Sequence, residues 1–334
     1  MSARIEVEGV SKQFAPRLTF GEKIAAGLGS AIETRTVHAL DGVSLTIEPG
    51  EAMGLVGESG CGKSTLGRII SGIMPPTSGS ARIAGEPVMA GGRRPIKRTT
   101  RVQMVFQDPF ASLDPRMRVG QAVAEGPIAH GLVSRADAAG YIAKWLEAVG
   151  LDPDFASRFP HQFSGGQRQR IAIARALAMQ PDVIVCDEPV ASLDVSIQAQ
   201  IINLFLKLRR ELGLTMLFIS HDLGVVRHVS DRVAIMYLGR IVEVGDARRI
   251  YQNPLHPYTS ALLDSVPKLV LEDDEVVTFK AIRGELPSAL APPSGCHFHS
   301  RCPHAVDRCR SEIPALREIE TLHRAACHLA PLGR

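Results

Sequence analysis

Two stretches of this sequence carry residues suited to binding and hydrolysing a nucleotide. Residues 57–65 read GESGCGKST and fit the phosphate-binding pattern G-x-x-x-x-G-K-[ST]. In such a loop glycines let the backbone approach phosphate, Lys63 can reach the β- and γ-phosphates, and the Ser64 hydroxyl can ligate Mg²⁺. The second stretch is Asp187-Glu188, which follows four apolar residues. Such a pair can divide into a Mg²⁺ ligand, Asp187, and a residue that orients or deprotonates the attacking water, Glu188.

A third stretch can bind an anion. Residues 163–167 read FSGGQ and precede a segment with no proline or further glycine up to residue 179, which predicts a helix. A serine hydroxyl and two glycine amides at a helix start form a second phosphate site. Two separated phosphate sites in one chain can serve a single nucleotide if two subunits pair head to tail.

The elements that must position these residues alternate between strand and helix. The apolar run 52–56 enters the phosphate loop, and Leu66, Ile69, Ile70 and Ile73 after it mark one helix face. Residues 4–10 are expected to form an edge strand. Further strands are expected at 43–47, 81–84, 102–106, 183–186 and 215–219, with a hairpin at 233–244. This alternation predicts an α/β fold, a parallel sheet with helices on both faces.

Composition limits the class of protein. The chain has 334 residues, a net charge of +3 and 22% charged residues, which gives no argument for nucleic-acid binding. The polar N-terminal residues do not suggest a signal peptide, and no apolar run approaches a membrane span. A cytosolic chain is expected, in which the six cysteines are not disulfides.

The chain divides into three parts on pattern. The nucleotide-binding core is predicted at 1–107 and 161–245, with an insertion at 15–36 to which no element is assigned. Residues 108–160, poor in strand signals, are predicted to be a helical insert. Residues 246–334 are proline-rich, carry four cysteines and are expected to be a separate extension.

With these motifs in order, residues 4–245 resemble the ATP-binding subunits of ABC transporters. The resemblance implies a P-loop NTPase cassette with a RecA-like parallel sheet, an antiparallel β subdomain and a helical insert, here followed by a small Cys-rich extension. It implies ATP and Mg²⁺ as ligands, with Ser64, Gln107 and Asp187 toward the metal. It implies catalytic roles for Glu188, for Gln107 of the Q-loop and for His221, the switch histidine. The implied nucleotide-binding residues are Phe14 (stacking on adenine), Gly57, Ser59, Gly60, Cys61, Gly62, Lys63, Ser64, Thr65, Gln107, Ser164, Gly165, Gly166, Gln167 and Asp194 (in the D-loop).

Two departures and one alternative accompany the resemblance. The resemblance implies that Ser164 to Gln167 belong to the family's signature motif. Phe163 stands where leucine is commoner in that motif, and Phe14 stands where tyrosine is more usual. As a lone aromatic residue at a strand end, Phe14 fits a core position equally well.

A closer resemblance is to the dipeptide/oligopeptide importer branch. It rests on residues 107–116, QDPFASLDPR, on residues 255–263, LHPYTSALL, and on Cys61 within the phosphate loop. The last of these is similar to the second ATPase subunit of such importers. The resemblance implies a heterodimer with a related ATPase, two membrane-spanning permeases, an extracytoplasmic peptide-binding protein, and a place at the cytoplasmic face of the membrane.

Rival functions remain open on sequence alone. The same fold can power uptake of nickel, glutathione or murein peptides, because the cargo pocket lies on other chains. An ABC protein acting on DNA or ribosomes is a rival of another class. Such proteins tend to carry tandem cassettes or long coiled coils, and this chain shows one cassette and no sustained heptads.

Four cysteines near the C-terminus suggest a metal centre. Cys296, Cys302, Cys309 and Cys327 follow the spacing C-x5-C-x6-C-x17-C, without the tight pair usual in structural zinc sites. Four thiolates suit a [4Fe–4S] cluster, and adjacent arginines would offset its negative charge. Zinc is the alternative, because His297, His299 and His304 are close in sequence, and a site without metal is the third possibility.

Overall fold

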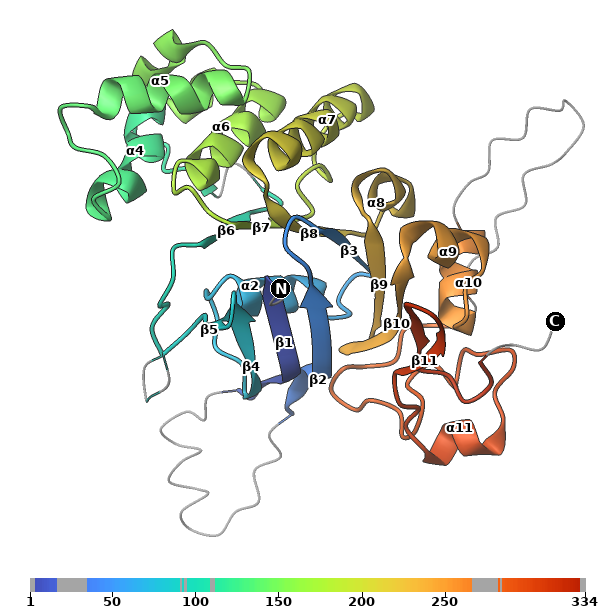
Figure 1. Cartoon of the computed structure of the whole chain (residues 1–334). Helices are drawn as coiled ribbons and strands as arrows, with labels where there is room; N and C mark the ends of the chain where they lie inside the picture. The colour runs from blue at the N-terminus through green and yellow to red at the C-terminus, as the bar shows by residue number, and fades with distance from the viewer. Residues whose placement is uncertain are drawn as a thin grey trace, which may run out of the picture.

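The computed structural model describes residues 4–16, 35–90, 92, 95–108, 112–265, 282 and 284–330. Its centre is an eight-stranded sheet in the order β11-β12-β10-β9-β3-β8-β7-β6 (Figure 1). The five strands from β9 to β6 run parallel. They are β9 Arg232–Tyr237, β3 Ala52–Val56, β8 Thr215–Ser220, β7 Val183–Asp187 and β6 Val102–Val105. The predicted parallel sheet is thus confirmed.

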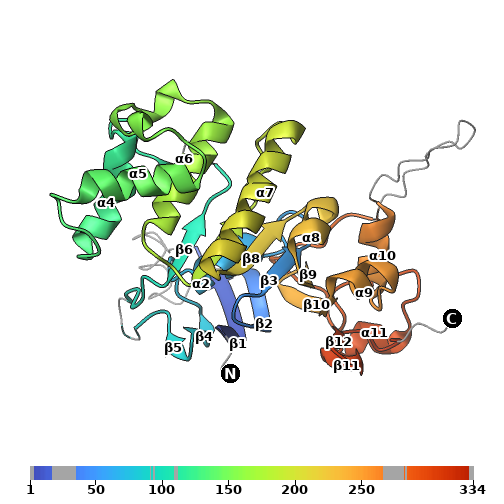
Figure 2. The ribbon, with the colours of Figure 1, turned by 45° about the horizontal axis from the view of Figure 1, so that its top comes forward.

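The central strands are apolar on both faces because both faces are covered. Along β8, Met216 and Phe218 pack into one hydrophobic cluster, and Leu217 and Ile219 pack into another. Helices α6, α7 and α8 cover one face, and α2 covers the other (Figures 1 and 2). Their bounds are α2 Lys63–Ile70, α6 Gly165–Leu177, α7 Val195–Leu212 and α8 Leu223–Val229.

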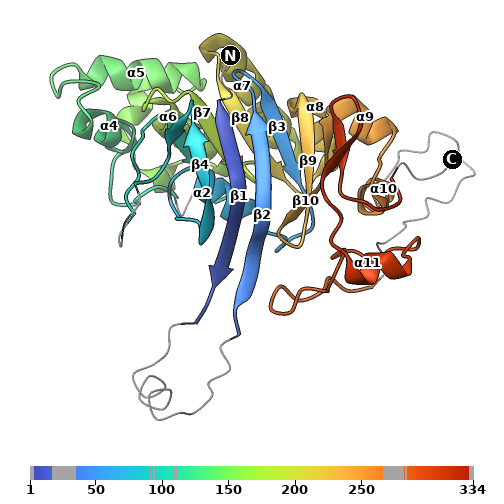
Figure 3. The ribbon, with the colours of Figure 1, turned by 60° about the horizontal axis from the view of Figure 1, so that its bottom comes forward.

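A second, antiparallel sheet lies beyond α2, which contacts strands of both sheets. Its order is β2-β1-β4-β5, from β1 Ile5–Phe14, β2 Val37–Ile47, β4 Ser78–Ile83 and β5 Glu86–Pro87. Figure 3 shows β1 and β2 side by side in this antiparallel sheet. Strand β1 pairs on both sides, so the prediction of an edge strand at 4–10 is wrong. Most of the insertion expected at 15–36, residues 17–34, lies outside the described residues.

The segment between β6 and α6 is helical. It contains α4 Val119–Ala129, α5 Ala138–Ala148 and the short 3-10 helices η1 Pro153–Ser157 and η2 Pro160–Gln162. These helices stand beside α6 at the β6 end of the sheet (Figure 1). Trp145 and Leu146 of α5 and Val149, its C-cap residue, are buried in the larger core.

The C-terminal segment extends the core sheet and is not separate from it. After β10 Arg240–Asp246, which is antiparallel to β9, come α9 Ala247–Gln252, α10 Pro257–Asp264 and α11 Asp307–Ser311. Strands β11 Arg317–Glu320 and β12 His323–Ala325 then complete the edge, with β12 antiparallel to β10. Figure 3 shows this tail beside β10. Among the helices of the described residues, none has the length and apolarity needed to span a membrane.

Candidate nucleotide site

The phosphate loop joins β3 to α2 and depends on its glycines. A Cβ on Gly57 would lie 2.2 Å from the carbonyl oxygen of Met236. Gly62 has φ +109, and a Cβ there would lie 2.4 Å from the carbonyl oxygen of Ala39. Only glycine meets both demands, the close approach and the left-handed backbone. The loop is therefore fixed against β9 and β2 while its amides remain at the start of α2.

Lys63 lies inside this loop. Its side chain is buried, and its Nζ donates to the carbonyl oxygens of Gly57 at 2.8 Å and Glu58 at 3.0 Å. Cys61 is buried beside it, and burial raises the pKa of the Cys61 thiol. The ammonium group therefore stands at the centre of the loop, where a phosphate anion would meet it.

Strand β7 brings its acidic end to the same place. The Ser64 hydroxyl donates to Asp187 Oδ1 at 2.8 Å. Burial raises the pKa of Asp187, against the opposing effect of the Ser64 hydrogen bond. A half-desolvated carboxylate paired with a hydroxyl is a donor set that suits Mg²⁺, which takes oxygen ligands. The structure therefore brings together two of the residues expected to face the metal.

Glu188 is the meeting point of the three expected catalytic residues. Gln107 Nε2 donates to Glu188 Oε2 at 3.1 Å, and His221 Nδ1 lies 3.2 Å from the same oxygen. The Glu188 backbone has φ +47, and its N–H donates to the carbonyl of Ile219 in β8. A non-glycine residue held in the left-handed region is strained, and such strain persists where the surrounding structure fixes it. The three side chains come from the ends of neighbouring parallel strands β6, β7 and β8.

The second anion motif forms the start of α6. Ser164 is the N-cap: its Oγ accepts from Gln167 N at 3.3 Å, and Gln167 Oε1 accepts from Ser164 N at 3.0 Å. A Cβ on Gly166 would lie 2.6 Å from Ile197 in α7, so this position also requires glycine. Gly165 lies against Leu193, one residue before Asp194, which is the N-cap residue of α7. The start of α6 and the segment that leads into α7 are thus neighbours, and neither belongs to the phosphate loop.

Phe14 lies at the end of β1 and is not a core residue. Its side chain is 40% exposed, and Lys12 Nζ lies 5.3 Å from the ring centroid. The core alternative is therefore wrong. Its contact with adenine stays a prediction, as do the individual roles of the other expected nucleotide-binding residues.

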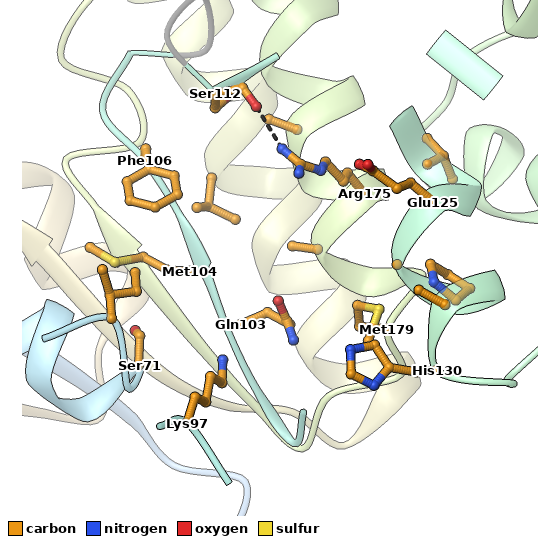
Figure 4. A pocket seen from close by; sticks show the side chains of 18 residues that line it. Ser71, Lys97, Gln103, Met104, Phe106, Ser112, Glu125, His130, Arg175 and Met179 are labelled. Atoms are coloured by element: carbon orange, nitrogen blue, oxygen red, sulfur yellow. Dashed lines mark hydrogen bonds between the residues drawn. The ribbon is translucent and has the colours of Figure 1, made fainter. Parts of the chain in front are cut away.

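A groove unrecognised in the sequence lies between β6 and the helical insert. Its volume is about 470 Å³. Figure 4 shows Gln103 from β6, Glu125 and His130 from the α4 side, and Arg175 from α6 around it. Arg175 Nη1 donates to the Ser112 carbonyl at 2.6 Å and so ties α6 to the segment after β6. Because the lining comes from residues far apart in the chain, no local signal could have revealed it.

The four C-terminal cysteines gather in one region. Burial raises the pKa of Cys296 to about 11 and also raises the pKa values of Cys302 and Cys327, and neighbouring thiols of the set add to each shift. Backbone N–H groups two residues ahead, at Phe298, His304 and Leu329, act in the opposite direction. The residues that the structure describes nevertheless contain no group of three or more His, Cys, Asp or Glu that could hold a metal ion as placed.

Comparison with known proteins gives matches along most of the chain. Residues 40–191 match the family model of ABC transporters, and residues 242–309 match the C-terminal region of oligopeptide/dipeptide transporters. The chain is 50% identical over 297 residues to the putative oligopeptide transport ATP-binding protein YkfD of Bacillus subtilis, covering 88% of this chain and 90% of that protein. It is 50% identical, with the same coverage, to the di/tripeptide transport ATP-binding protein DppF of Pseudomonas aeruginosa.

Solved structures give the same picture of the fold. The chain is similar to cbiO1 from Clostridium perfringens, part of the ABC transporter complex cbiONQ, with a TM-score of 0.59 and 27% identity over 75% of this chain and 91% of that one. It is also similar to the ATP-binding cassette MJ0796 in a post-hydrolysis state bound to ADP and Pi. There the TM-score is 0.58 and the identity 28%, covering 73% of this chain and 99% of that one.

Proposed function

This chain belongs to the ATP-binding proteins of ABC transporters, in the oligopeptide/dipeptide branch, and we propose that it hydrolyses ATP to drive the import of small peptides through partner permeases. The observation that carries the proposal is the convergence of Gln107 and His221 on one oxygen of Glu188. Asp187, the residue before Glu188, bonds to Ser64 of α2, and these two residues would hold Mg²⁺ beside it. Together they provide both the phosphate-facing and the water-facing halves of a hydrolytic site.

We assign the residue roles from this geometry. Lys63 and the amides at the start of α2 would hold the phosphates, and Ser64 and Asp187 would hold Mg²⁺. When bound, Mg²⁺ would supply positive charge that offsets the negative charge of the phosphates. Glu188 accepts a proton from the attacking water or orients it, while Gln107 and His221 fix the carboxylate direction. A matched base of this kind contributes about 10²–10⁴-fold to the rate.

The position of the signature supports action by two subunits. Ser164 and Gln167 cap α6 and bond to each other, and the motif lies on a different element from the phosphate loop. Two chains arranged head to tail would place the α6 start of one against the nucleotide of the other. We propose a related second ATPase as the partner chain, with ATP binding closing the pair and hydrolysis opening it.

The groove beside β6 supports a docking site for a permease segment. Phe106 lines the groove, and the next residue, Gln107, donates to Glu188. A displacement at the groove would therefore reach the catalytic carboxylate through adjacent residues. We propose that the chain sits at the cytoplasmic face of the membrane by this contact, and that a binding protein delivers the peptide from the other side.

We also propose that the four C-terminal cysteines bind a [4Fe–4S] cluster, with zinc as the alternative. What supports it is the donor chemistry: four thiols in one region, three of them facing backbone N–H groups that favour thiolates. Anaerobic purification followed by iron, sulfide and zinc analysis tests it. Stoichiometric iron and sulfide, lost in Cys302→Ser, would bear it out; zinc without sulfide would replace the cluster, and metal-free protein would remove both.

Transport itself tests the proposed function. The chain, its partner ATPase, two permeases and the binding protein would be reconstituted in vesicles, and ATP-dependent uptake of labelled dipeptides and oligopeptides measured. We expect peptide uptake with the wild-type chain and no uptake with Lys63→Ala. Uptake of nickel or glutathione without peptide uptake would move the function to that rival cargo.

A further inference from the structure

The phosphate loop is held from outside by the C-terminal tail. Arg301 makes two parallel bonds to the Glu58 carboxylate, Nη1 to Oε2 at 2.7 Å and Nη2 to Oε1 at 3.0 Å. The Arg301 side chain is only 5% exposed. A second tail residue, Tyr258 of α10, accepts the Glu58 backbone N–H at its hydroxyl, at 2.9 Å. The tail thus binds both the side chain and the backbone of one loop residue.

An aromatic cluster fixes the two tail residues in place. Phe298, three residues before Arg301, is buried, with ring centroids 5.3 Å from Tyr237 and 5.4 Å from Tyr258. The Tyr237 hydroxyl also lies 3.4 Å from Arg301 Nη1. Tyr237 ends β9, the strand beside β3, so the cluster joins the tail to the strand layer that carries the loop. The residues that contact Glu58 are therefore held by a packed aromatic cluster and do not belong to a mobile surface segment.

Glu58 connects the tail residues Arg301 and Tyr258 to the phosphate-binding Lys63. Its carbonyl oxygen accepts from Lys63 Nζ at 3.0 Å, while its N–H and carboxylate are held by the tail. The loop on either side contains glycines at 57, 60 and 62, which carry a large conformational entropy that must be lost before phosphate is bound. A contact that fixes the loop beforehand increases affinity by removing this cost from the binding step.

We propose that Arg301 and Tyr258 are positioning residues that hold the phosphate loop in its ATP-binding shape, so that the C-terminal tail sets the affinity for ATP. This inference rests on the proposed function, since it concerns the same nucleotide site. A bidentate hydrogen-bonded pair between a buried arginine and a carboxylate is stronger than hydrogen bonds between neutral groups. Their loss is expected to weaken ATP binding by about tenfold or more.

The test uses the full-length chain with Glu188→Gln in the background, so that ATP is bound without turnover. Three changes are compared: Arg301→Met, Tyr258→Phe, and Arg308→Met as the matched control. Arg308 is a tail arginine whose partner, Glu312, lies four residues away in the exposed tail. Tyr258→Phe keeps the ring that packs on Phe298 and removes only the acceptor for Glu58 N–H. Limited proteolysis of each variant reports whether the tail remains folded.

The proposal expects weaker ATP binding for Arg301→Met and Tyr258→Phe, with Arg308→Met unchanged and the tail protected. In the assembled transporter, with Glu188 intact, KM for ATP should rise while kcat changes little. If both variants bind ATP as tightly as the background chain with a protected tail, the contacts only dock the tail and the proposal is wrong. If Arg301→Met unfolds the tail, the ATP affinity of the Tyr258→Phe variant decides between the two outcomes. Failure of the background chain itself to bind ATP would contradict the proposed function instead.

Discussion

His256 should make the free energy of unfolding depend on pH. The residue is buried at the start of α10, where its Nδ1 accepts from Tyr258 N at 3.0 Å and its backbone N–H donates to Glu243 at 2.9 Å. Burial lowers the pKa of His256 to about 4, although the nearby Glu243 carboxylate acts in the opposite direction. The unfolded chain has the ordinary histidine pKa of about 6.5. Below that value the unfolded state therefore binds a proton that the folded state excludes.

The sign and size of the effect follow from this difference. Above about pH 6.5 His256 is neutral in both states and the free energy of unfolding keeps its full value. As the pH falls from about 6.5 toward about 4, the unfolded chain takes up a proton and the free energy of unfolding decreases. Between pH 7 and pH 5 the linkage amounts to about 2 kcal/mol for His256 alone. Urea denaturation at both pH values would be compared for the wild type and His256→Asn, which keeps a side-chain acceptor for the helix cap. The wild type should lose about 2 kcal/mol more than the variant on acidification. Equal losses in the two proteins would show that His256 does not cause the pH dependence.

Two further predictions concern the loop and the assembly. Gly57→Ala should abolish ATP binding, because its Cβ would meet Met236 O at 2.2 Å, whereas Gly140→Ala, with open space around it on α5, should leave binding unchanged; isothermal titration of both variants checks this. The isolated chain should hydrolyse ATP slowly, because Ser164 and its neighbours serve a second subunit. Its turnover should rise when the partner ATPase and permeases are added, and full activity of a demonstrated monomer would count against head-to-tail pairing.

Local pattern was enough to predict the nucleotide half of the molecule. The loop at 57–65, Asp187 and Glu188 each follow an apolar strand, and parallel strands bring their carboxyl ends to one edge of a sheet. That topological rule is why Gln107, Glu188 and His221, far apart in sequence, meet at one oxygen. The family resemblance added the order of the motifs.

What the sequence failed to predict depends on contacts without a local pattern. Alternation along β1 indicates a half-buried strand but not how many neighbours it has, so an internal strand was expected at an edge. Strands β11 and β12 are too short to show a period, and the pairing of β12 with β10 joins segments about eighty residues apart. The Arg301–Glu58 pair spans still more of the chain and leaves no trace in either segment.

The role of Glu188 in ATP hydrolysis can be measured by one comparison. ATP turnover and ATP affinity would be measured in the same preparation of the assembled transporter, with wild-type chain and with Glu188→Gln. Turnover of the variant should be lower by at least about 10²-fold, because the carboxylate that Gln107 and His221 hold is gone. Affinity should stay near that of the wild type, because Lys63 and Ser64 are untouched. Turnover close to the wild-type rate would show that Glu188 is not the catalytic carboxylate.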